Sequence, residues 1–371
     1  MKVLLAQFRK PACETRFYDK IGAAIAAAGH SVLSAGNDIP SSANPGNPII
    51  KLLPIFSSRA AEDGSVVKDL LLLWQVINNE KPDFLIYTSP EIGLLLPLLR
   101  LCTSTKIIFD IQENHFLNIR KQNFSGRKRR LHSFMARILV QLGLKFSHRI
   151  WLAERIYETQ LPIPANKATS IENKAVFFPR VNPKLKQEGS FFCFSGFISR
   201  ESGVIRAINF IKVLRKHRPE IKLRIHGYCP DKKLRDEIQQ EDFVEFKNPH
   251  LWASAGEINQ TLRDSLGILM PYYETESNAG KTPSKWFDAL LLHKPVLIPL
   301  HTKFKLPLAE SMSFSVDFQN PEENNFESIL HFIDNWSKVD SVLEEEKEKW
   351  RFDPLPVQLE ILRLSERLSF S

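Results

Sequence analysis

Residues 278–299 have the sequence NAGKTPSKWFDALLLHKPVLIP, which contains a loop, a helix and a strand in that order. The polar loop contains glycine and proline, the helix pattern covers 285–292, and the apolar run 295–300 has the composition of a strand. Another apolar run, 267–270, precedes the loop. A strand, a loop, a helix and a second strand make the repeating unit of an α/β fold with a parallel sheet. This stretch therefore predicts the fold class.

The same alternation extends over the rest of the chain. The second half has further strand patterns at 191–196, 221–226 and 243–246, with helix patterns at 205–214 and 258–262. The first half has strand patterns at 2–7, 31–33, 84–87 and 106–111, with helix patterns at 17–28, 67–77 and 92–101. The Pro-rich stretch 40–65 is predicted to be a surface loop with one strand at 49–53.

A polar stretch at 181–189 separates these two series of elements, and 371 residues are enough for two apolar cores. We predict two Rossmann-like, doubly wound parallel-sheet domains, 1–182 and 190–345, that face a central cleft. The charged segment 346–371 is predicted to be a helix, either on the surface or packed back on the N-terminal domain. Its predicted apolar face consists of Leu359, Ile361, Leu362, Leu364 and Leu368.

The sequence shows no sign of a secreted, membrane-spanning or metal-binding cysteine protein. The chain starts with a strand pattern rather than a signal peptide, so a cytosolic protein is predicted. The most apolar stretch, 92–101, has about half the length of a membrane span. The cysteines lack metal-ligand spacing and are predicted to be reduced, buried thiols: Cys13, Cys102, Cys193 and Cys229.

The turn before the 285–292 helix has the chemistry of an anion-binding site. Unpaired backbone N–H groups at Gly280 and Ser284, and the charges of Lys281 and Lys285, would hold a pyrophosphate at the positive end of the helix dipole. Asp288 lies three residues after Lys285, where its carboxylate could accept hydrogen bonds from both ribose hydroxyls. A capped surface helix with an ion pair would produce the same pattern, so both interpretations stay open at this point.

The run KWFDALLLHKPV, residues 285–296, resembles the donor-site helix of glycosyltransferase family 4, written K-[LFW]-F-E-Y-[ML]-A-x-G-[KL]-P-V. Five further segments resemble landmarks of that family in the same order: 16–32, 107–114, 171–174, 194–198 and 265–271. The resemblance implies the GT-B fold, with an acceptor-binding N-terminal domain and a donor-binding C-terminal domain. It also implies transfer of a hexosyl or related group from a UDP- or GDP-linked sugar to a hydroxyl acceptor, with retention of the anomeric configuration.

The chain departs from the family pattern around the donor. Asp288 takes the place of the ribose-binding glutamate, whereas Gly280 stands near the place of the sugar-binding one. The family's phosphate-binding Arg and Lys, in a G-R-x-x-x-x-K-G loop after Gly196, are replaced by Phe197 and Ser202. Arg200 is the nearest remaining cation, so the resemblance implies a donor diphosphate on Arg200, Gly196 and the turn at 280–285.

The catalytic candidates of the N-terminal domain follow the strand at 106–111. The family's cleft histidine corresponds to Gln112, which leaves Glu113 as the matched acid and His115 as a nearby imidazole. Glu113 would bind the acceptor hydroxyl or cap the next helix. No Asp-x-Asp pair follows an apolar strand, so a site without metal or cofactor is predicted, in which backbone amides and cations replace Mg²⁺.

The net charge of +8 is concentrated between residues 120 and 149, which contain nine Lys or Arg and no acid. Apolar residues at helical spacing make this segment a basic amphipathic helix, typical of a surface that binds an anionic membrane leaflet. The residues predicted to contact the membrane are Arg127, Lys128, Arg129 and Arg130. A core-packed helix with a solvated basic rim is equally compatible, whereas nucleic acid is disfavoured because no aromatic stacking platform accompanies the charge.

These features predict a cytoplasmic enzyme, peripheral on the inner face of the membrane, that assembles a polysaccharide or glycolipid. Its partners would be a nucleotide sugar and a saccharide or lipid-linked acceptor. The substituted motif residues support an alternative, a non-catalytic GT-B descendant that binds a nucleotide, a lipid or a protein partner.

Overall fold

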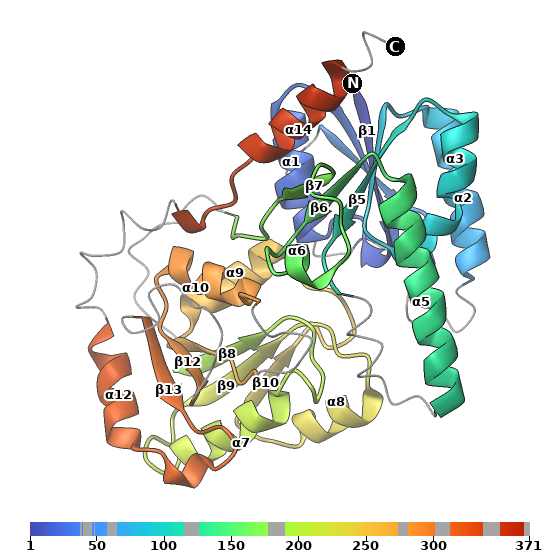
Figure 1. The fold of residues 1–371 in the computed structure, drawn as a ribbon. Helices are drawn as coiled ribbons and strands as arrows, with labels where there is room; N and C mark the ends of the chain where they lie inside the picture. Colours follow the sequence, from blue (N-terminus) through green and yellow to red (C-terminus); the bar gives the residue numbers. More distant parts are fainter. Residues whose placement is uncertain are drawn as a thin grey trace. The chain divides into compact units, whose positions relative to one another are not determined.

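A computed structural model of the chain describes residues 1–37, 39, 47, 49–57, 65–114, 126–176, 190–273, 281–300, 312–336 and 349–366. The chain forms two compact units. Unit 1 comprises Met1–Asn173 and Phe352–Ser371, and unit 2 comprises Lys174–Arg351. Each unit contains one parallel sheet (Figure 1). The predicted linker at 181–189 lies outside the described residues.

Unit 1 has a seven-stranded parallel sheet in the order β3-β2-β1-β4-β5-β6-β7. Its strands are β1 (Lys2–Pro11), β2 (Ser31–Asn37), β3 (Ile50–Pro54), β4 (Phe84–Tyr87), β5 (Lys106–Ile111), β6 (Arg149–Leu152) and β7 (Ala168–Ser170). Every residue of β4, and all of β5 after Lys106, is buried. Strands that are covered on both faces consist of continuous apolar residues, which is why their sequence patterns do not alternate.

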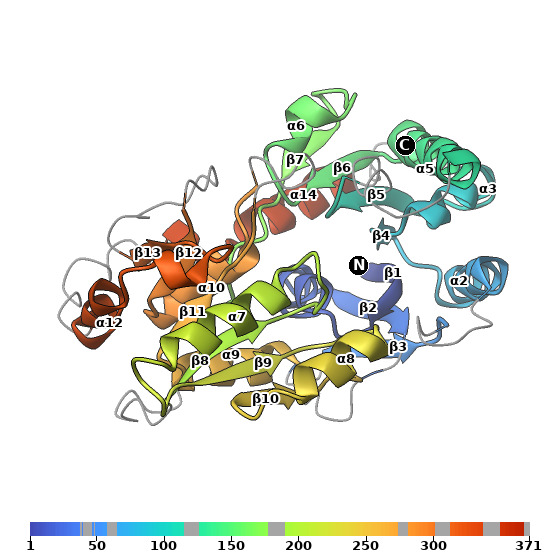
Figure 2. The same ribbon diagram turned by 90° about the horizontal axis from the view of Figure 1, so that it is seen from below.

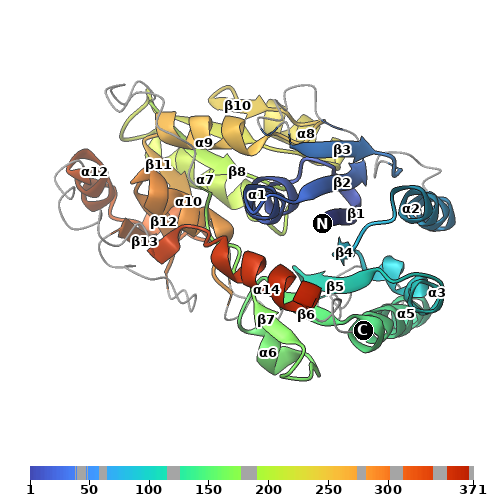
Figure 3. The ribbon, with the colours of Figure 1, turned by 90° about the horizontal axis from the view of Figure 1, so that it is seen from above.

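Helices cover both faces of this sheet, as Figure 3 shows. One face carries α2 (Val66–Glu80), the 3₁₀ helix η2 (Pro90–Leu94), α3 (Leu96–Cys102), α5 (Gly126–Phe146) and α6 (Tyr157–Gln160). The other face carries the π-helical segment η1 (Arg16–Gly22), α1 (Ala23–Ala27) and the C-terminal helix α14 (Leu355–Glu366).

Helix α14 belongs to the core of unit 1. Val357, Ile361 and Leu364 are buried against the η1 and α1 face of the sheet. Buried Glu360 accepts hydrogen bonds from Arg149 Nε at 2.7 Å and Nη2 at 2.9 Å. The outer apolar residues of the segment remain exposed, because only positions spaced by four and three residues reach the sheet.

Unit 2 has a six-stranded parallel sheet in the order β10-β9-β8-β11-β12-β13, which Figure 2 shows from below. Its strands are β8 (Phe191–Ser195), β9 (Lys222–His226), β10 (Val244–Lys247), β11 (Gly267–Leu269), β12 (Val296–Pro299) and β13 (Ser313–Val316). Its helices are α7 (Val204–Leu214), α8 (Lys232–Gln239), α9 (Ala255–Asp264), α10 (Ser284–Leu292), the 3₁₀ turn η3 (Pro321–Glu323) and α12 (Phe326–Asp334). Helices α9 and α10 lie on one face, and α7 and α8 on the other (Figure 1).

The order of the strands creates a topological switch point in unit 2. From β8 the chain moves outward through β9 to β10, and then crosses to β11 on the other side of β8. The loops that leave β8 and β11 therefore run in opposite directions from neighbouring strands. Ligands of open α/β sheets bind at this position, outside the carboxyl ends of the strands.

The predicted α/β class with two parallel sheets is confirmed. Two predicted helices are each divided in two. The helix at 92–101 consists of η2 and α3, because Pro97 in the first turn of α3 has no N–H to continue the preceding helix. The segment at 17–28 consists of the π-helical η1 followed by α1.

The prediction of buried cysteines was only partly right. All four cysteines are free thiols; Cys193 and Cys229 are buried, Cys13 is partly exposed, and Cys102 is exposed at the end of α3. Within the described ranges, no helix combines the length and the apolar character needed to cross a membrane.

Candidate functional site

The first turn of α10 presents several of the predicted residues on its outer side. Trp286 and Phe287 are buried in the core, whereas Lys285 and Asp288 are partly exposed and Ser284 is exposed. The two candidate side chains thus point away from the apolar core of unit 2. Lys281, which precedes the helix, is also partly exposed, and Gly280 lies outside the described residues.

Lys285 lies against Gly196, although 88 residues separate them in the sequence. A Cβ atom on Gly196 would be 2.7 Å from Lys285 Nζ, and Gly196 has a left-handed φ of +108°. Gly196 follows β8 and Lys285 belongs to the helix that follows β11. The structure therefore brings these two predicted residues together at the switch point of unit 2.

The loop between β8 and α7 (residues 196–203) provides no cation at the two family positions. Ser202 Oγ accepts a hydrogen bond from Ser199 N at 3.0 Å, and Ser199 Oγ accepts one from Ser202 N at 3.1 Å, so Ser202 closes a turn. Phe197 contacts the rings of Tyr228 and Trp252, with centroids 6.3 and 6.4 Å away.

Arg200, the remaining cation of this loop, is exposed and forms an ion pair with Glu237 of α8. Its guanidinium is thus engaged on the outer side of the β8–α7 loop. No contact between Arg200 and Lys285 is present among the described interactions.

The sequence did not indicate Arg206, a second cation at the switch point. Arg206, in the first turn of α7, donates to the carbonyl of Pro271 at the end of β11, from Nη2 at 3.0 Å and Nε at 3.3 Å. Its guanidinium also lies 5.0 Å from the ring centroid of Tyr273. Only its place in the first turn after the β8–α7 loop could have suggested this role, because its contacts are far away in the sequence.

A buried histidine supports the loops behind this site. His226 at the end of β9 is within 2.8 Å of Thr261 Oγ1 and 3.2 Å of Asn248 Nδ2. Burial lowers the pKa of His226, which favours the neutral ring that these contacts require. The next residue, Gly227, approaches so closely that a Cβ atom on it would be 1.8 Å from the carbonyl oxygen of Gly196. Only glycine fits at this position.

In unit 1, Gln112 stands where glycosyltransferase family 4 has its cleft histidine, and its side chain belongs to a hydrogen-bonded polar network. Gln112 Nε2 donates to Asp110 Oδ2 at 2.9 Å, and Gln112 Oε1 accepts from Lys10 Nζ at 2.6 Å. Asp110 also forms a buried, bidentate ion pair with Arg16, at 2.6 and 2.8 Å. Glu113 follows and is exposed at the end of β5, whereas His115 lies outside the described residues.

Helix α5 is packed along only part of its length. Val140 and Leu144 in its C-terminal half are buried, and the backbone of Gly93 in η2 lies against the carbonyl of Leu139. The N-terminal part of α5 extends past α3 in Figure 1. Between Arg130 and Ile138 the helix has exposed apolar side chains beside exposed basic ones. The exposed residues are Arg130, Leu131, Phe134, Met135, Arg137 and Ile138. The side chains of Arg127, Lys128 and Arg129 lie outside the described set.

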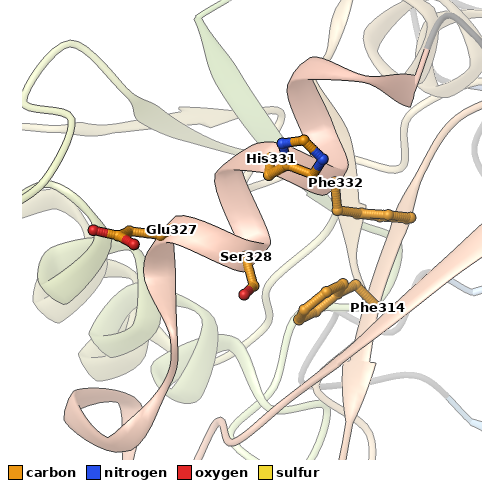
Figure 4. A pocket seen from close by; sticks show the side chains of 5 residues that line it. All are labelled: Phe314, Glu327, Ser328, His331 and Phe332. Atoms are coloured by element: carbon orange, nitrogen blue, oxygen red, sulfur yellow. The ribbon is translucent and has the colours of Figure 1, made fainter.

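Unit 2 also has a pocket between α12 and β13 (Figure 4). It is lined by Phe314, Glu327, Ser328, His331 and Phe332. None of the residues at the switch point contributes to this pocket, so it is distinct from the candidate site.

No protein-family model matches the chain, and no curated protein matches its sequence. Solved structures nevertheless match over nearly its whole length. Sucrose-phosphate synthase from Thermosynechococcus elongatus has a TM-score of 0.68 and 12% sequence identity, and the match covers 99% of each chain. WaaG, a glycosyltransferase involved in lipopolysaccharide biosynthesis, has a TM-score of 0.65 at 11% identity, covering 97% of this chain and 98% of that chain.

HepE from Anabaena, solved in complex with UDP and glucose, has a TM-score of 0.64 at 15% identity, and the match covers 100% of each chain. HepE has also been solved with UDP-glucose. At these low sequence identities, the structural matches show similarity of fold. The two parallel sheets and these matches show that the chain has the GT-B fold.

Proposed function

We propose that the protein is a glycosyltransferase that moves a sugar from a nucleotide-sugar donor to a hydroxyl acceptor. The observation that carries this proposal is the Lys285 ammonium against Gly196, where β8 and β11 meet and their loops diverge. A cation beside a glycine at a switch point is suited to a phosphate that approaches the backbone. The structure of HepE with UDP-glucose, on the same fold, supports a nucleotide sugar as the ligand.

The donor contacts follow from the position of α10. Lys285 and Lys281 would neutralise the diphosphate, and Gly196, Gly280 and Ser284 would offer it backbone N–H groups or close backbone approach. Asp288, one turn after Lys285 on the outer side of the helix, would accept hydrogen bonds from the ribose hydroxyls. Arg200 would contribute only if its ion pair with Glu237 breaks and its guanidinium binds the diphosphate instead.

The proposed reaction retains the anomeric configuration and uses no metal. The bond between the anomeric carbon and the phosphate oxygen breaks, the acceptor oxygen bonds to the same carbon, and the acceptor proton moves to the departing phosphate. Positive side chains stabilise the charge that develops on the leaving diphosphate. Glu113 and His115 would bind the acceptor at the end of β5.

The proposed acceptor is a polysaccharide or glycolipid precursor at the cytoplasmic face of the membrane. Helix α5 supports this, because it exposes Phe134 and Leu131 at 59% and 60% of their surface, beside Arg130 and Arg137. Such a surface would bind an anionic leaflet through both apolar contact and charge. Replacing residues 127–130 with Ser should release the protein from anionic vesicles in sedimentation, and unchanged binding would refute the membrane proposal.

Donor hydrolysis tests the activity itself. Purified protein incubated with UDP-, GDP- and dTDP-sugars should slowly release the nucleoside diphosphate from at least one of them. No release from any sugar would favour the non-catalytic alternative, which the absence of a cation at positions 197 and 202 also supports.

A further inference from the structure

Two glycines bound the β8–α7 loop, and each lies close to a cation; at Gly203 the Pro271 carbonyl oxygen, 2.6 Å from a Cβ atom placed there, is closer still. Gly196 has φ +108° and Gly203 has φ +85°, and both are in the left-handed region. A Cβ atom on Gly196 would lie 2.7 Å from Lys285 Nζ, and one on Gly203 would lie 2.9 Å from Arg206 Nη2. Lys285 and Arg206 therefore stand at the two ends of the same loop.

Two consecutive tyrosines, Tyr272 and Tyr273, follow β11 in the chain and lie beside these cations. Lys285 Nζ lies 5.7 Å from the ring centroid of Tyr272, and the Arg206 guanidinium lies 5.0 Å from that of Tyr273. Pro271, the residue before them, accepts two hydrogen bonds from Arg206. Aromatic faces stabilise the cations without neutralising them, so the charge remains available to an anion.

Neither cation pairs with a carboxylate among the residues that the structure describes. Other arginines of unit 2 do: Arg200 with Glu237, Arg218 with Asp334 and Arg224 with Glu245. Both Lys285 and Arg206 are only partly exposed, so part of their hydration is lost. Partly desolvated cations that have no carboxylate partner among the described residues favour an anionic ligand.

The hydrogen bonds of Arg206 fix its orientation. Nε and one Nη2 proton are directed at the Pro271 carbonyl, which leaves both protons of Nη1 and the second Nη2 proton for another acceptor. A guanidinium held in this way is preorganised for a planar or tetrahedral oxyanion, because little side-chain entropy is lost on binding.

We propose that Arg206 and Lys285 form a clamp for the diphosphate of the nucleotide sugar, with Arg206 supplying the charge that the β8–α7 loop lacks at positions 197 and 202. This proposal rests on the proposed function. The diphosphate lies over the loop between its two glycines, with one cation at each end.

The test is a binding experiment with the full chain and three ligands, UDP, GDP and inorganic pyrophosphate, at fixed ionic strength. Arg206→Gln keeps a hydrogen-bond donor for the Pro271 carbonyl but removes the charge. Arg206→Lys keeps the charge but removes the planar guanidinium with its several N–H donors. Arg218→Ala is the control, because Arg218 lies beyond the C-terminal end of α7 and pairs with Asp334 of α12. Melting temperatures of all variants show whether each one is folded.

We expect Arg206→Gln to bind UDP and pyrophosphate roughly 10- to 150-fold more weakly, the range for a charge-assisted hydrogen bond. Arg206→Lys should recover part of this loss, and Arg218→Ala should bind both ligands like the wild type. A folded Arg206→Gln variant that binds UDP and pyrophosphate with wild-type affinity would overturn the proposal that Arg206 binds the diphosphate. A wild-type protein that binds pyrophosphate but neither UDP nor GDP would refute the donor function and leave the clamp intact, whereas no binding of any of the three would refute both.

Discussion

Replacing Lys285 with Met removes one charge from the switch point and keeps most of the apolar side chain. The ammonium makes no ion pair in the described part of the chain; its recorded neighbours are the Tyr272 ring and the backbone of Gly196. Loss of the charge should therefore change the free energy of unfolding by less than about 1 kcal/mol, the upper range of an exposed cation–π contact.

The effect of Lys285→Met on ligand binding should be much larger. A hydrogen bond between a charged donor and a phosphate oxygen contributes about 1.5 to 3 kcal/mol, which corresponds to a loss of roughly 10- to 150-fold in UDP affinity. Titration calorimetry with UDP measures the affinity, and urea denaturation without ligand measures stability. The conservative variant Lys285→Arg should keep most of the binding, because the charge remains.

Two results would refute this reasoning about Lys285. UDP affinity equal to the wild type would show that the ammonium does not contact the phosphates. A loss of several kcal/mol in stability would show that Lys285 holds the β8–α7 loop in place rather than binding the ligand.

Three further predictions test other parts of the structure. Asp288→Ala should weaken UDP binding by about 1 to 3 kcal/mol in calorimetry, through lost ribose hydrogen bonds, and unchanged affinity would remove the ribose assignment. Gly227→Ala should lower the free energy of unfolding by about 3 kcal/mol or more in urea denaturation, because its Cβ would overlap the Gly196 carbonyl at 1.8 Å; an unchanged midpoint would contradict this contact. Burial, and then Glu14, raises the pKa of Asp19 from 3.8 to about 7, so the folded state binds more protons and the wild type should lose stability as pH rises from about 4 to 7. In thermal denaturation across this pH range, Asp19→Asn should abolish the loss of stability. A variant with the same pH dependence as the wild type would contradict the assignment to Asp19.

The parallel-sheet fold could be predicted because buried strands and their helices have local sequence patterns. The strands at 84–87 and 106–111 have the predicted bounds, since continuous apolar runs between turns give unambiguous signals. The C-terminal helix was harder to place. Its apolar face was predicted to include Leu359 and Leu362, which are 40% and 48% exposed, because the choice of buried face depends on the distant η1 and α1 surface that it meets.

The candidate site was predicted only as far as its residues are close in sequence or match a family motif. Lys285 and Asp288 are in one helix turn, so their shared side follows from helical spacing. Arg206 was missed because its position depends on the Pro271 carbonyl, 65 residues away. The ion pair of Arg200 with Glu237 likewise depends on where α8 lies, which periodicity does not specify.

The central claim is that a nucleotide diphosphate binds where the loops after β8 and β11 diverge. A crystal structure of the protein with UDP tests this claim directly. We expect a diphosphate within hydrogen-bond distance of Lys285 Nζ and over Gly196, with the ribose toward Asp288. A UDP molecule bound elsewhere on unit 2, for example in the pocket between α12 and β13, would contradict it.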